Sequence, residues 1–397
     1  MLRNLDLKDI DHLKDELNNI EVATEGIDIM LPKAQPYLFK TDKISSSAAI
    51  LLKEQMLDLG AECAIARDAV MNSNKKYPTI LIGSKAHFDQ LVQQLDTEGY
   101  PELSQLIEEL KHFFATQAGS CLKIQDQSID ISNRTRIMGI LNITPDSFSD
   151  GGRFDSPDSA IKAALKMEKQ GADIIDIGGE STRPGAEPVS IEEEYKRVLP
   201  VIKGIRKKSD IPISIDTYKS KVAKKALSNG ANIVNDISGL RFDSGMANTI
   251  ARYDATVIMM HIQGEPRNMQ DNPSYENLFD DILNYLETSI KIALDSGIAK
   301  DQIVLDPGIG FGKEWEANYR ILQHLNEFKS LGYPLLIGPS RKSFIGNLLN
   351  LPPDQRLEGS LAAAVAGVMN GADIVRVHDV KETSRAIQVA DKIIGKR

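Results

Sequence analysis

The segment IMGILNITPDSFSDGG, residues 137–152, is the stretch that decides the fold. It begins with a continuous apolar run from Ile137 to Leu141. It becomes polar at Asn142, where hydroxyl, carboxylate, proline and glycine residues follow. A short apolar run bounded by turn residues is typical of a strand buried on both faces. The segment therefore predicts a buried strand whose carboxyl end carries several polar groups into a loop.

The same pattern occurs eight times from this segment to the C-terminus. The apolar runs are 137–141, 174–177, 213–215, 233–234, 257–260, 303–305, 335–337 and 374–377. Helical segments separate them, for example SAIKAALKMEKQGA at residues 159–172. Continuous apolar strands that alternate with helices indicate a parallel sheet covered on its outer face, and eight such units predict a closed (β/α)8 TIM barrel. An open doubly wound sheet is the alternative architecture.

The first 118 residues lack this pattern. They contain short apolar strands near residues 61–65 and 79–82 and an amphipathic helix with Leu103, Ile107 and Leu110 on one face. We expect a small α/β domain at 1–118 and a catalytic barrel at 119–397, with CLKIQDQSIDIS at 121–132 forming a hairpin before the first barrel strand. We find no catalytic constellation in the smaller domain, so its role stays open.

Composition limits the classes of function. The net charge of −9 argues against nucleic acid or a membrane as the main partner. No apolar run approaches the roughly 20 residues that span a bilayer. The two cysteines, Cys63 and Cys121, are too few for a disulfide framework or a cysteine-rich zinc site. Because the N-terminal residues also lack the apolar core of a signal peptide, we expect a cytoplasmic protein.

Asp216, Asn235 and Asp306 follow the third, fourth and sixth predicted strands. Polar groups at the carboxyl ends of barrel strands converge on the barrel axis, where the active sites of TIM barrels lie. A carboxylate accepts two N–H donors in one plane, and asparagine offers both a donor and an acceptor. The set therefore suits the amino-pyrimidinone edge of a fused nitrogen heterocycle, although each residue alone could be a helix N-cap or a turn residue.

Cationic residues follow the last two strands. Lys342, Arg376 and His378 lie where barrels often bind phosphate, and an arginine fork suits phosphate bidentately. Asn142 could supply an oxygen to Mg²⁺. The alternative for Arg376 is a salt bridge to a loop carboxylate. The segment DPGIGFGK at 306–313 is not a Walker A loop, because Glu314 stands where a serine or threonine is required.

Two glycine- and proline-rich loops, TPDSFSDGG at 144–152 and GGESTRPGAEP at 178–188, follow the first two strands. They are interpreted as loops that order over substrates, with plain exposed turns as the alternative.

Eight motifs, in this order, resemble those of the dihydropteroate synthase family of pterin-binding barrels. The motifs are MGILNITPDSFSDGG, DIGGESTRPGA, SIDT, NDISG, HIQGEPRNMQ, LDPGIGFGK, GPSRKSFIG and RVHDV. The resemblance covers residues 122–395, with conservative departures at Ile262 and Ile309. The N-terminal region is absent from the common form of the family.

The resemblance implies a substrate pair, a metal ion and an assembly. The chain would join 6-hydroxymethyl-7,8-dihydropterin diphosphate to p-aminobenzoate, with Mg²⁺, to give 7,8-dihydropteroate and pyrophosphate. It would be a homodimer, formed through helices flanking the last strands, and a sulfonamide target. The reaction would follow an SN1-like path, because the electron-rich dihydropterin can stabilise a cation at the methylene carbon.

The resemblance also assigns residues by number. The pterin would be held by Asp216, Asn235, Asp306, Lys342 and Arg376. The p-aminobenzoate would be held by Phe148, Thr182, Arg183, Pro184 and Ser340. The diphosphate would be held by Asn142, Arg376 and His378, with Asn142 also binding the metal. The catalytic set would be Asp216, Asp306, Lys342, Arg376 and His378.

Two other functions remain open at this stage. A pterin-barrel methyltransferase that moves a methyl group from methyltetrahydrofolate to a corrinoid would share the pterin-binding acids. It would not be expected to need the STRP, SRK and RVHD segments for a diphosphate. A non-catalytic pterin-binding protein would require loss of the diphosphate or loop residues, and these are present.

Overall fold

The computed structural model describes residues 10–41, 43–71, 75–116, 121–124, 127–143, 156–182 and 185–396. The chain divides into two compact units, Met1–Gln117 and Ala118–Arg397. Each unit is described by itself below.

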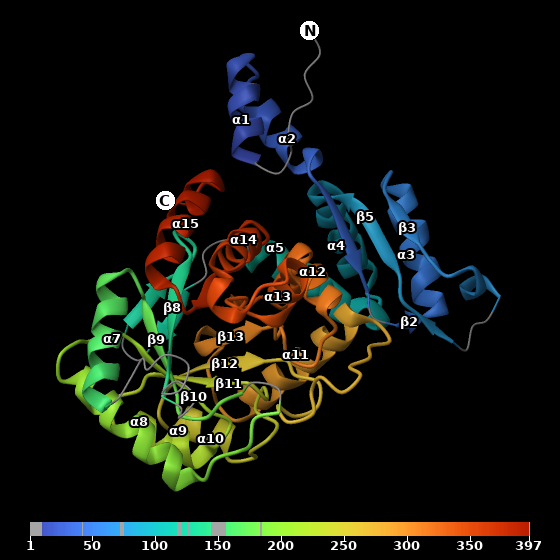
Figure 1. Cartoon of the computed structure of the whole chain (residues 1–397). Helices are drawn as coiled ribbons and strands as arrows, with labels where there is room; N and C mark the ends of the chain where they lie inside the picture. The colour runs from blue at the N-terminus through green and yellow to red at the C-terminus, as the bar shows by residue number, and fades with distance from the viewer. Residues whose placement is uncertain are drawn as a thin grey trace. The chain divides into compact units, whose positions relative to one another are not determined.

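The larger unit is built on a ring of parallel strands (Figure 1). The strands are β8 (Arg136–Asn142), β9 (Ile174–Gly178), β10 (Ile213–Asp216), β11 (Ile233–Asp236), β12 (Thr256–Met260), β13 (Ile303–Asp306), β14 (Leu336–Ile337) and β15 (Ile374–Val377). Their order is β13-β12-β11-β10-β9-β8-β15-β14. A parallel bridge between Leu305 and Leu335 joins β13 to the segment before β14 and closes the ring. The predicted TIM barrel is therefore confirmed, and the open doubly wound sheet is excluded.

Helices cover the outer face of the ring. They are α7 (Pro157–Lys169), α8 (Ile191–Arg206), α9 (Ser220–Leu227), α10 (Met246–Arg252), α11 (Leu278–Asp295), α12 (Trp315–Gln323), α13 (Ser343–Leu349), α14 (Leu357–Met369) and α15 (Val380–Ile393). In α8, the buried residues Val198, Val201, Ile202 and Ile205 follow the helical spacing and pack into the core between helices and strands. Among the described residues, no helix is long and apolar enough to cross a membrane.

A hairpin closes the N-terminal end of the barrel. It consists of β6 (Cys121–Ile124) and β7 (Gln127–Asp130), and it confirms the predicted hairpin, although its turn residues 125–126 lie outside the described residues. Leu122, Ile124 and Ile131 are buried in one cluster with the first residues of several barrel strands, including Ile174 and Ile374. The catalytic end of the barrel is therefore the opposite one.

The smaller unit is an α/β domain, as predicted. Its antiparallel sheet has the order β1 (Pro36–Lys40), β5 (Ile80–Ser84) and β3 (Glu62–Ala64), with a separate pair of β2 (Ile44–Ser45) and β4 (Lys76–Tyr77). Its helices are α1 (Ile10–Asn19), α2 (Thr24–Ala34), α3 (Ser46–Asp58), α4 (Lys85–Glu98) and α5 (Ser104–Thr116). Leu52, Met56, Phe88 and Leu91 form its core with Leu103.

Candidate active site

One cavity gathers six of the residues predicted for the site. It lies at the carboxyl ends of the barrel strands, where TIM-barrel active sites are found. The cavity is lined by Thr182, Asp216, Asn235, Ile237, Met260, Asp306, Ile309, Phe311, Gly338, Lys342 and Arg376. Because each strand ends at this edge, residues 90 or more positions apart, such as Asp216 and Asp306, meet in one place.

Arg376 from β15 binds two carboxylates across the barrel. Its Nε lies 2.6 Å from Asp176 Oδ2, and its Nη2 lies 2.6 Å from Asp216 Oδ2. Asn235 Nδ2 donates to the same Asp176 oxygen at 3.3 Å. Arg376 therefore organises the acidic side of the cavity. The salt bridge to a loop carboxylate that the sequence left as the alternative is not what Arg376 forms, because both of its carboxylate partners belong to barrel strands.

Asp176 is a functional candidate that the sequence analysis missed. It lies inside the apolar strand β9, is fully buried, and its Oδ1 has no hydrogen-bond partner among the described residues. A buried carboxylate costs free energy unless it is paired, so a charged residue inside an apolar run was the available signal. Asp176 is the second carboxylate that Arg376 binds, although it is not among the residues that line the cavity.

Asp216 and Asp306 retain acceptor capacity for a ligand. Asp216 Oδ1 is buried and has no partner within the described part of the chain. Asp306 Oδ1 accepts a hydrogen bond from Gly308 N at 2.7 Å. Burial raises the pKa of Asp216 to about 7, against the charge of Arg376, and burial raises the pKa of Asp306 to about 6, against the bond from Gly308. A ligand that donates N–H hydrogen bonds to Asp216 and Asp306 would stabilise their ionised forms and lower both pKa values.

The opposite wall combines a cation with apolar side chains. Lys342 Nζ lies 3.9 Å from the centre of the Phe311 ring, and burial together with Arg376 lowers the pKa of Lys342 to about 8. Phe311 packs in a buried cluster with Ile237, Met260, Ile262 and Met269. A flat aromatic ligand can therefore contact apolar surface on its face and charged groups at its edge.

The segment 306–313 has a structural role next to this wall. Gly308, Gly310 and Gly312 all have positive φ, and a Cβ on Gly308 would lie 1.9 Å from His261 O. Lys313 is buried, and its Nζ lies 2.9 Å from His261 Nδ1 and donates to Phe311 O at 3.0 Å. Lys313 thus fixes the loop from within, which agrees with the exclusion of a Walker A reading.

His378 and Ser340 pair with each other beside the cavity. Ser340 Oγ lies 3.0 Å from His378 Nδ1 and accepts a hydrogen bond from His378 N at 3.2 Å. The neighbouring Arg341 has φ of 59° and donates to both oxygens of Asp379. The loops after β14 and β15 are therefore tied together, and neither Ser340 nor His378 is among the residues lining the cavity.

Asn142 lies at the end of β8, at the same edge. A Cβ on its neighbour Gly178 would lie 3.4 Å from Asn142 Oδ1 and 3.7 Å from Asp216 Cβ, so both side chains lie next to Gly178. Phe148, Arg183 and Pro184 lie outside the described residues, and their predicted roles stay predictions.

Comparisons with known proteins identify the family. The sequence matches the pterin-binding enzyme family over residues 138–378. It is 53% identical over 274 residues to the dihydropteroate synthase of Clostridium beijerinckii, covering 69% of this chain and 99% of that protein. The chain belongs to the dihydropteroate synthase family. It is therefore a transferase, and its barrel is the part that the family shares.

Two further comparisons bear on the structure and on the N-terminal unit. The dihydropteroate synthase of Yersinia pestis, solved with a sulfonamide drug, aligns with a TM-score of 0.66 and 46% identity over 69% of this chain and 98% of that one. A probable bifunctional folylpolyglutamate synthase/dihydropteroate synthase of Halobacterium salinarum is 37% identical over 386 residues, which is 97% of this chain and 46% of that protein. The second match extends through the N-terminal unit.

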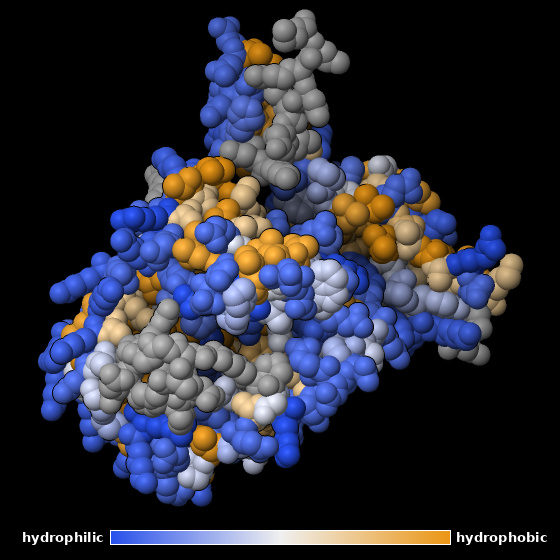
Figure 2. Space-filling view, in the orientation of Figure 1, coloured by the Kyte–Doolittle hydropathy of each residue, from blue (hydrophilic) through white to orange (hydrophobic). Residues whose placement is uncertain are grey.

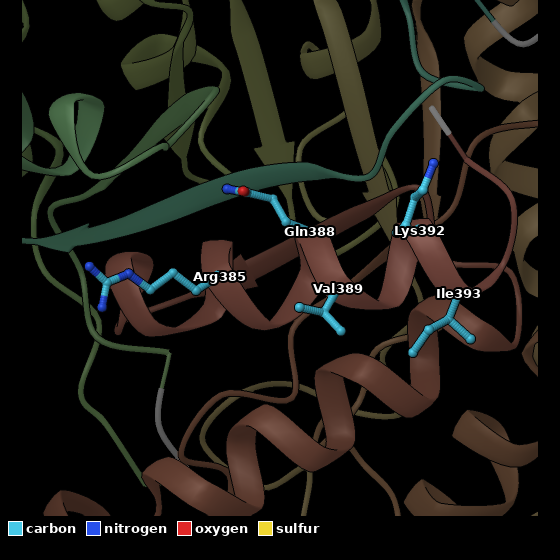
Figure 3. A pocket seen from close by; sticks show the side chains of 5 residues that line it. All are labelled: Arg385, Gln388, Val389, Lys392 and Ile393. Atoms are coloured by element: carbon cyan, nitrogen blue, oxygen red, sulfur yellow. The ribbon is translucent and has the colours of Figure 1, made fainter.

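A second hollow lies on the outer face of α15, away from the strand ends. It is lined by Arg385, Gln388, Val389, Lys392 and Ile393 (Figure 3). Val389 and Ile393 are 61% and 68% exposed. None of the predicted site residues lines this hollow, so it has no part in the candidate active site.

Proposed function

We propose that this member of the dihydropteroate synthase family joins 6-hydroxymethyl-7,8-dihydropterin diphosphate to p-aminobenzoate, releasing pyrophosphate. The observation that supports the proposal most directly is the single cavity in which Asp216, Asp306, Asn235, Lys342 and Arg376 meet. Carboxylates with spare acceptors can take the N–H groups of a pterin, and the apolar wall can hold its ring.

The acids also suit the charge that develops during an SN1-like reaction. As the bond between the methylene carbon and the diphosphate breaks, positive charge spreads over the dihydropterin. The oxygens of Asp216 and Asp306 lie at this ring site and stabilise that charge in a buried environment. Lys342 places a positive charge at the same cavity. It can donate hydrogen bonds to the pterin ring or stabilise the negative charge of the leaving diphosphate. The arylamine of p-aminobenzoate is already neutral, so no strong general base is needed.

The diphosphate would be held by Asn142, Arg376 and His378. Arg376 already forms ion pairs with Asp176 and Asp216. These two carboxylates compensate part of its positive charge, which would weaken its attraction for the diphosphate. His378 stands with Ser340 in the tied loops after β14 and β15. Asn142 and His378 are therefore the two proposed diphosphate ligands that are not ion-paired with Asp176 or Asp216 among the described residues.

Asn142 is the residue that would hold Mg²⁺. Within the part of the chain that the structure describes, no group of three His, Cys, Asp or Glu residues could hold a metal ion. This donor set fits Mg²⁺, which is commonly bound by one or two protein oxygens together with substrate phosphates and waters. Asn142 Oδ1 and the Asp216 side chain both lie next to Gly178, so the amide oxygen stands close to the acids of the site. When bound, Mg²⁺ would neutralise charge on the leaving diphosphate.

The p-aminobenzoate would bind at the mouth of the cavity. Thr182, in the loop after β9, lines the cavity, and Ser340 lies in the loop after β14. Phe148, Arg183 and Pro184 would complete this subsite. An ordered loop over the ring would also exclude water, which otherwise captures the cation.

The assembly we propose is a homodimer formed through α13, α14 and α15. Hydrophobic side chains gather on the surface over these helices (Figure 2), and Leu348, Met369, Val389 and Ile393 are all more than half exposed. Contiguous exposed apolar side chains mark interaction surfaces. The reducing cytoplasm remains the proposed compartment, supported by Cys63 and Cys121, which are both free.

Release of pyrophosphate tests the activity. Purified protein with Mg²⁺, the pterin diphosphate and p-aminobenzoate should release pyrophosphate and form dihydropteroate in equal amounts. Turnover of methyltetrahydrofolate with a corrinoid, without pyrophosphate release, would support the methyltransferase instead. Tight binding of the pterin diphosphate without any turnover would indicate a non-catalytic pterin-binding protein.

A further inference from the structure

The loop between β9 and α8 is closed at its base by a side chain. This loop carries Thr182, which lines the cavity. Glu180 stands at its start and Val189 at its end, and Val189 N donates to Glu180 Oε2 at 3.1 Å. The two ends of the loop therefore meet at one carboxylate.

Lys219, from the turn after β10, binds the same point. Its Nζ donates to Val189 O at 2.8 Å and to Glu194 Oε2 at 2.8 Å, and it forms an ion pair with Glu180. These three contacts match the three donors of an ammonium group. The Glu180 and Glu194 side chains are 8% and 1% exposed. One partly buried cation thus joins both ends of the loop to the first turn of α8.

Tyr218 links this cluster to the apolar wall of the cavity. Its hydroxyl donates to Glu180 Oε1 at 2.5 Å. Burial and the Glu180 carboxylate raise the pKa of Tyr218, so the hydroxyl keeps its proton and remains a donor. The ring packs against the cluster that contains Phe311 and Met260. The residues from Asp216 to Lys219 therefore reach the ring site at one end and the loop at the other.

The approach of α8 to the loop is close. A Cβ on Gly179 would lie 2.9 Å from Glu194 Cγ and 2.8 Å from Val198 Cγ1. Glycine at 179 therefore allows the loop to pass against the helix that carries Glu194. The loop is also bound on its far side, where Gly185 N donates to Pro266 O at 3.3 Å.

We propose that Glu180 and Lys219 are positioning residues that hold Thr182 at the cavity mouth and so set the binding of p-aminobenzoate rather than of the pterin. The inference rests on the proposed function. Asp216 is held by Arg376 and Asp306 by Gly308 N, so the carboxylates that would bind the pterin have partners other than Glu180 and Lys219. Misplacing the loop should thus weaken the second substrate and leave the first in place.

Steady-state kinetics with both substrates tests the proposal. In Lys219→Met and Glu180→Gln, the KM for p-aminobenzoate should rise roughly 10- to 100-fold, because small misplacements of positioning groups have effects of this size. The dissociation constant of the pterin diphosphate should stay within about twofold, a small part of that loop-positioning effect. Lys219→Arg, which keeps the charge and several donors, should recover part of the loss.

A matched control separates positioning from stability. Lys329 is a partly exposed lysine that forms an ion pair with Asp373. Asp373 directly precedes β15 and so lies at the N-terminal end of the barrel. Lys329→Met should lower the thermal midpoint without changing the ratio of the two substrate constants. If Lys219→Met does not fold, Tyr218→Phe, which removes one hydrogen bond and keeps the ion pairs, should show a smaller rise in the same KM.

The outcomes are distinguishable. Equal weakening of both substrates in folded variants, or an unchanged KM for p-aminobenzoate, overturns the positioning role while wild-type turnover still supports the proposed function. Lack of turnover by the wild-type protein overturns the proposed function itself.

Discussion

Arg376 Nη2 lies 2.6 Å from Asp216 Oδ2, and the same guanidinium holds Asp176 through Nε at 2.6 Å. One cation thus compensates two carboxylates that are 0% and 8% exposed. Removing one partner of a buried ion pair is costly, because the remaining charge stays buried without compensation. The arrangement makes Arg376 both a stabilising residue and a residue of the site.

Arg376→Ala should lower turnover by roughly 10²–10³, as loss of one preorganised charged group often does. It should also lower the free energy of unfolding by about 3 kcal/mol, because Asp176 and Asp216 lose their partner. Turnover is checked by pyrophosphate release and stability by urea unfolding. Asp176→Asn combined with Arg376→Ala should regain stability but not activity. Wild-type turnover in Arg376→Ala would contradict the assigned role.

Lys342→Ala should lower turnover by a similar factor of roughly 10²–10³, through the lost charge at the cavity. Its effect on stability should be smaller, because within the described residues Lys342 forms no hydrogen bond to a carboxylate. Comparing unfolding of this variant with that of Arg376→Ala gives the measurement. An equal loss of stability in both would count against the different roles of the two cations.

The rate should depend on pH in a bell-shaped manner. Asp216 and Asp306, with pKa values raised to about 7 and about 6, must be ionised, and Lys342, with its pKa lowered to about 8, must be protonated. The value of kcat/KM should therefore fall below pH 6 to 7 as the acids gain protons, and above pH 8 as Lys342 loses its proton.

Two measurements isolate these limbs. Lys342→Arg should move the alkaline limb upward, because arginine stays protonated. The affinity for 6-hydroxymethylpterin, which carries no phosphate, should fall at low pH in the same way as kcat/KM. If the acid limb disappears without the phosphate, the titrating group belongs to the substrate.

The surface over α14 and α15 should mediate self-association. Val389→Asp together with Ile393→Asp should convert a dimer to a monomer in sedimentation velocity, because charges would be buried in an apolar interface. Val70→Asp changes an equally exposed valine of the smaller unit, 69% exposed against 61% for Val389, and should leave the mass unchanged. A wild-type monomer would contradict the proposed dimer.

Truncation should separate the two units. A chain that begins at Ala118 should fold, because the Clostridium beijerinckii relative is matched over 99% of its length by 69% of this chain. A chain that begins at Ser132 also loses the buried residues Leu122, Ile124 and Ile131. Each fully buried side chain of this kind contributes about 1.5–3 kcal/mol, so this shorter chain should be markedly less stable. Thermal unfolding of the two chains measures the difference.

The sequence predicted the barrel because its eight strands are continuous apolar runs with polar carboxyl ends. Every predicted run overlaps one strand, and Asp216, Asn235 and Asp306 meet as the barrel topology requires. Asp176 escaped notice because side chains alternate along a strand. Ile175 and Ile177 pack toward the helices, whereas Asp176 faces the interior, and an apolar run does not reveal which set points inward.

Contacts between residues that are far apart in the chain could not be predicted from the sequence either. Lys219 binds Glu180 across 39 positions, and Arg376 binds Asp176 across 200. Such pairs depend on which strands become neighbours and on how far each loop extends. The pairing of Ser340 with His378 has the same origin, because the two residues lie in the loops that follow the neighbouring strands β14 and β15.

The hairpin of β6 and β7 covers the N-terminal end of the barrel, so within the described residues the cavity is approached from the carboxyl ends of the strands. Under the proposed function, a pterin held by Asp216 and Asp306 would have to enter before p-aminobenzoate, if the latter is held by Thr182 in the loop beyond the strand ends. The p-aminobenzoate could then bind and dissociate while the pterin diphosphate stays bound. Dihydropteroate would then leave with its p-aminobenzoate end first, and the order of binding and release would follow from the architecture of the barrel.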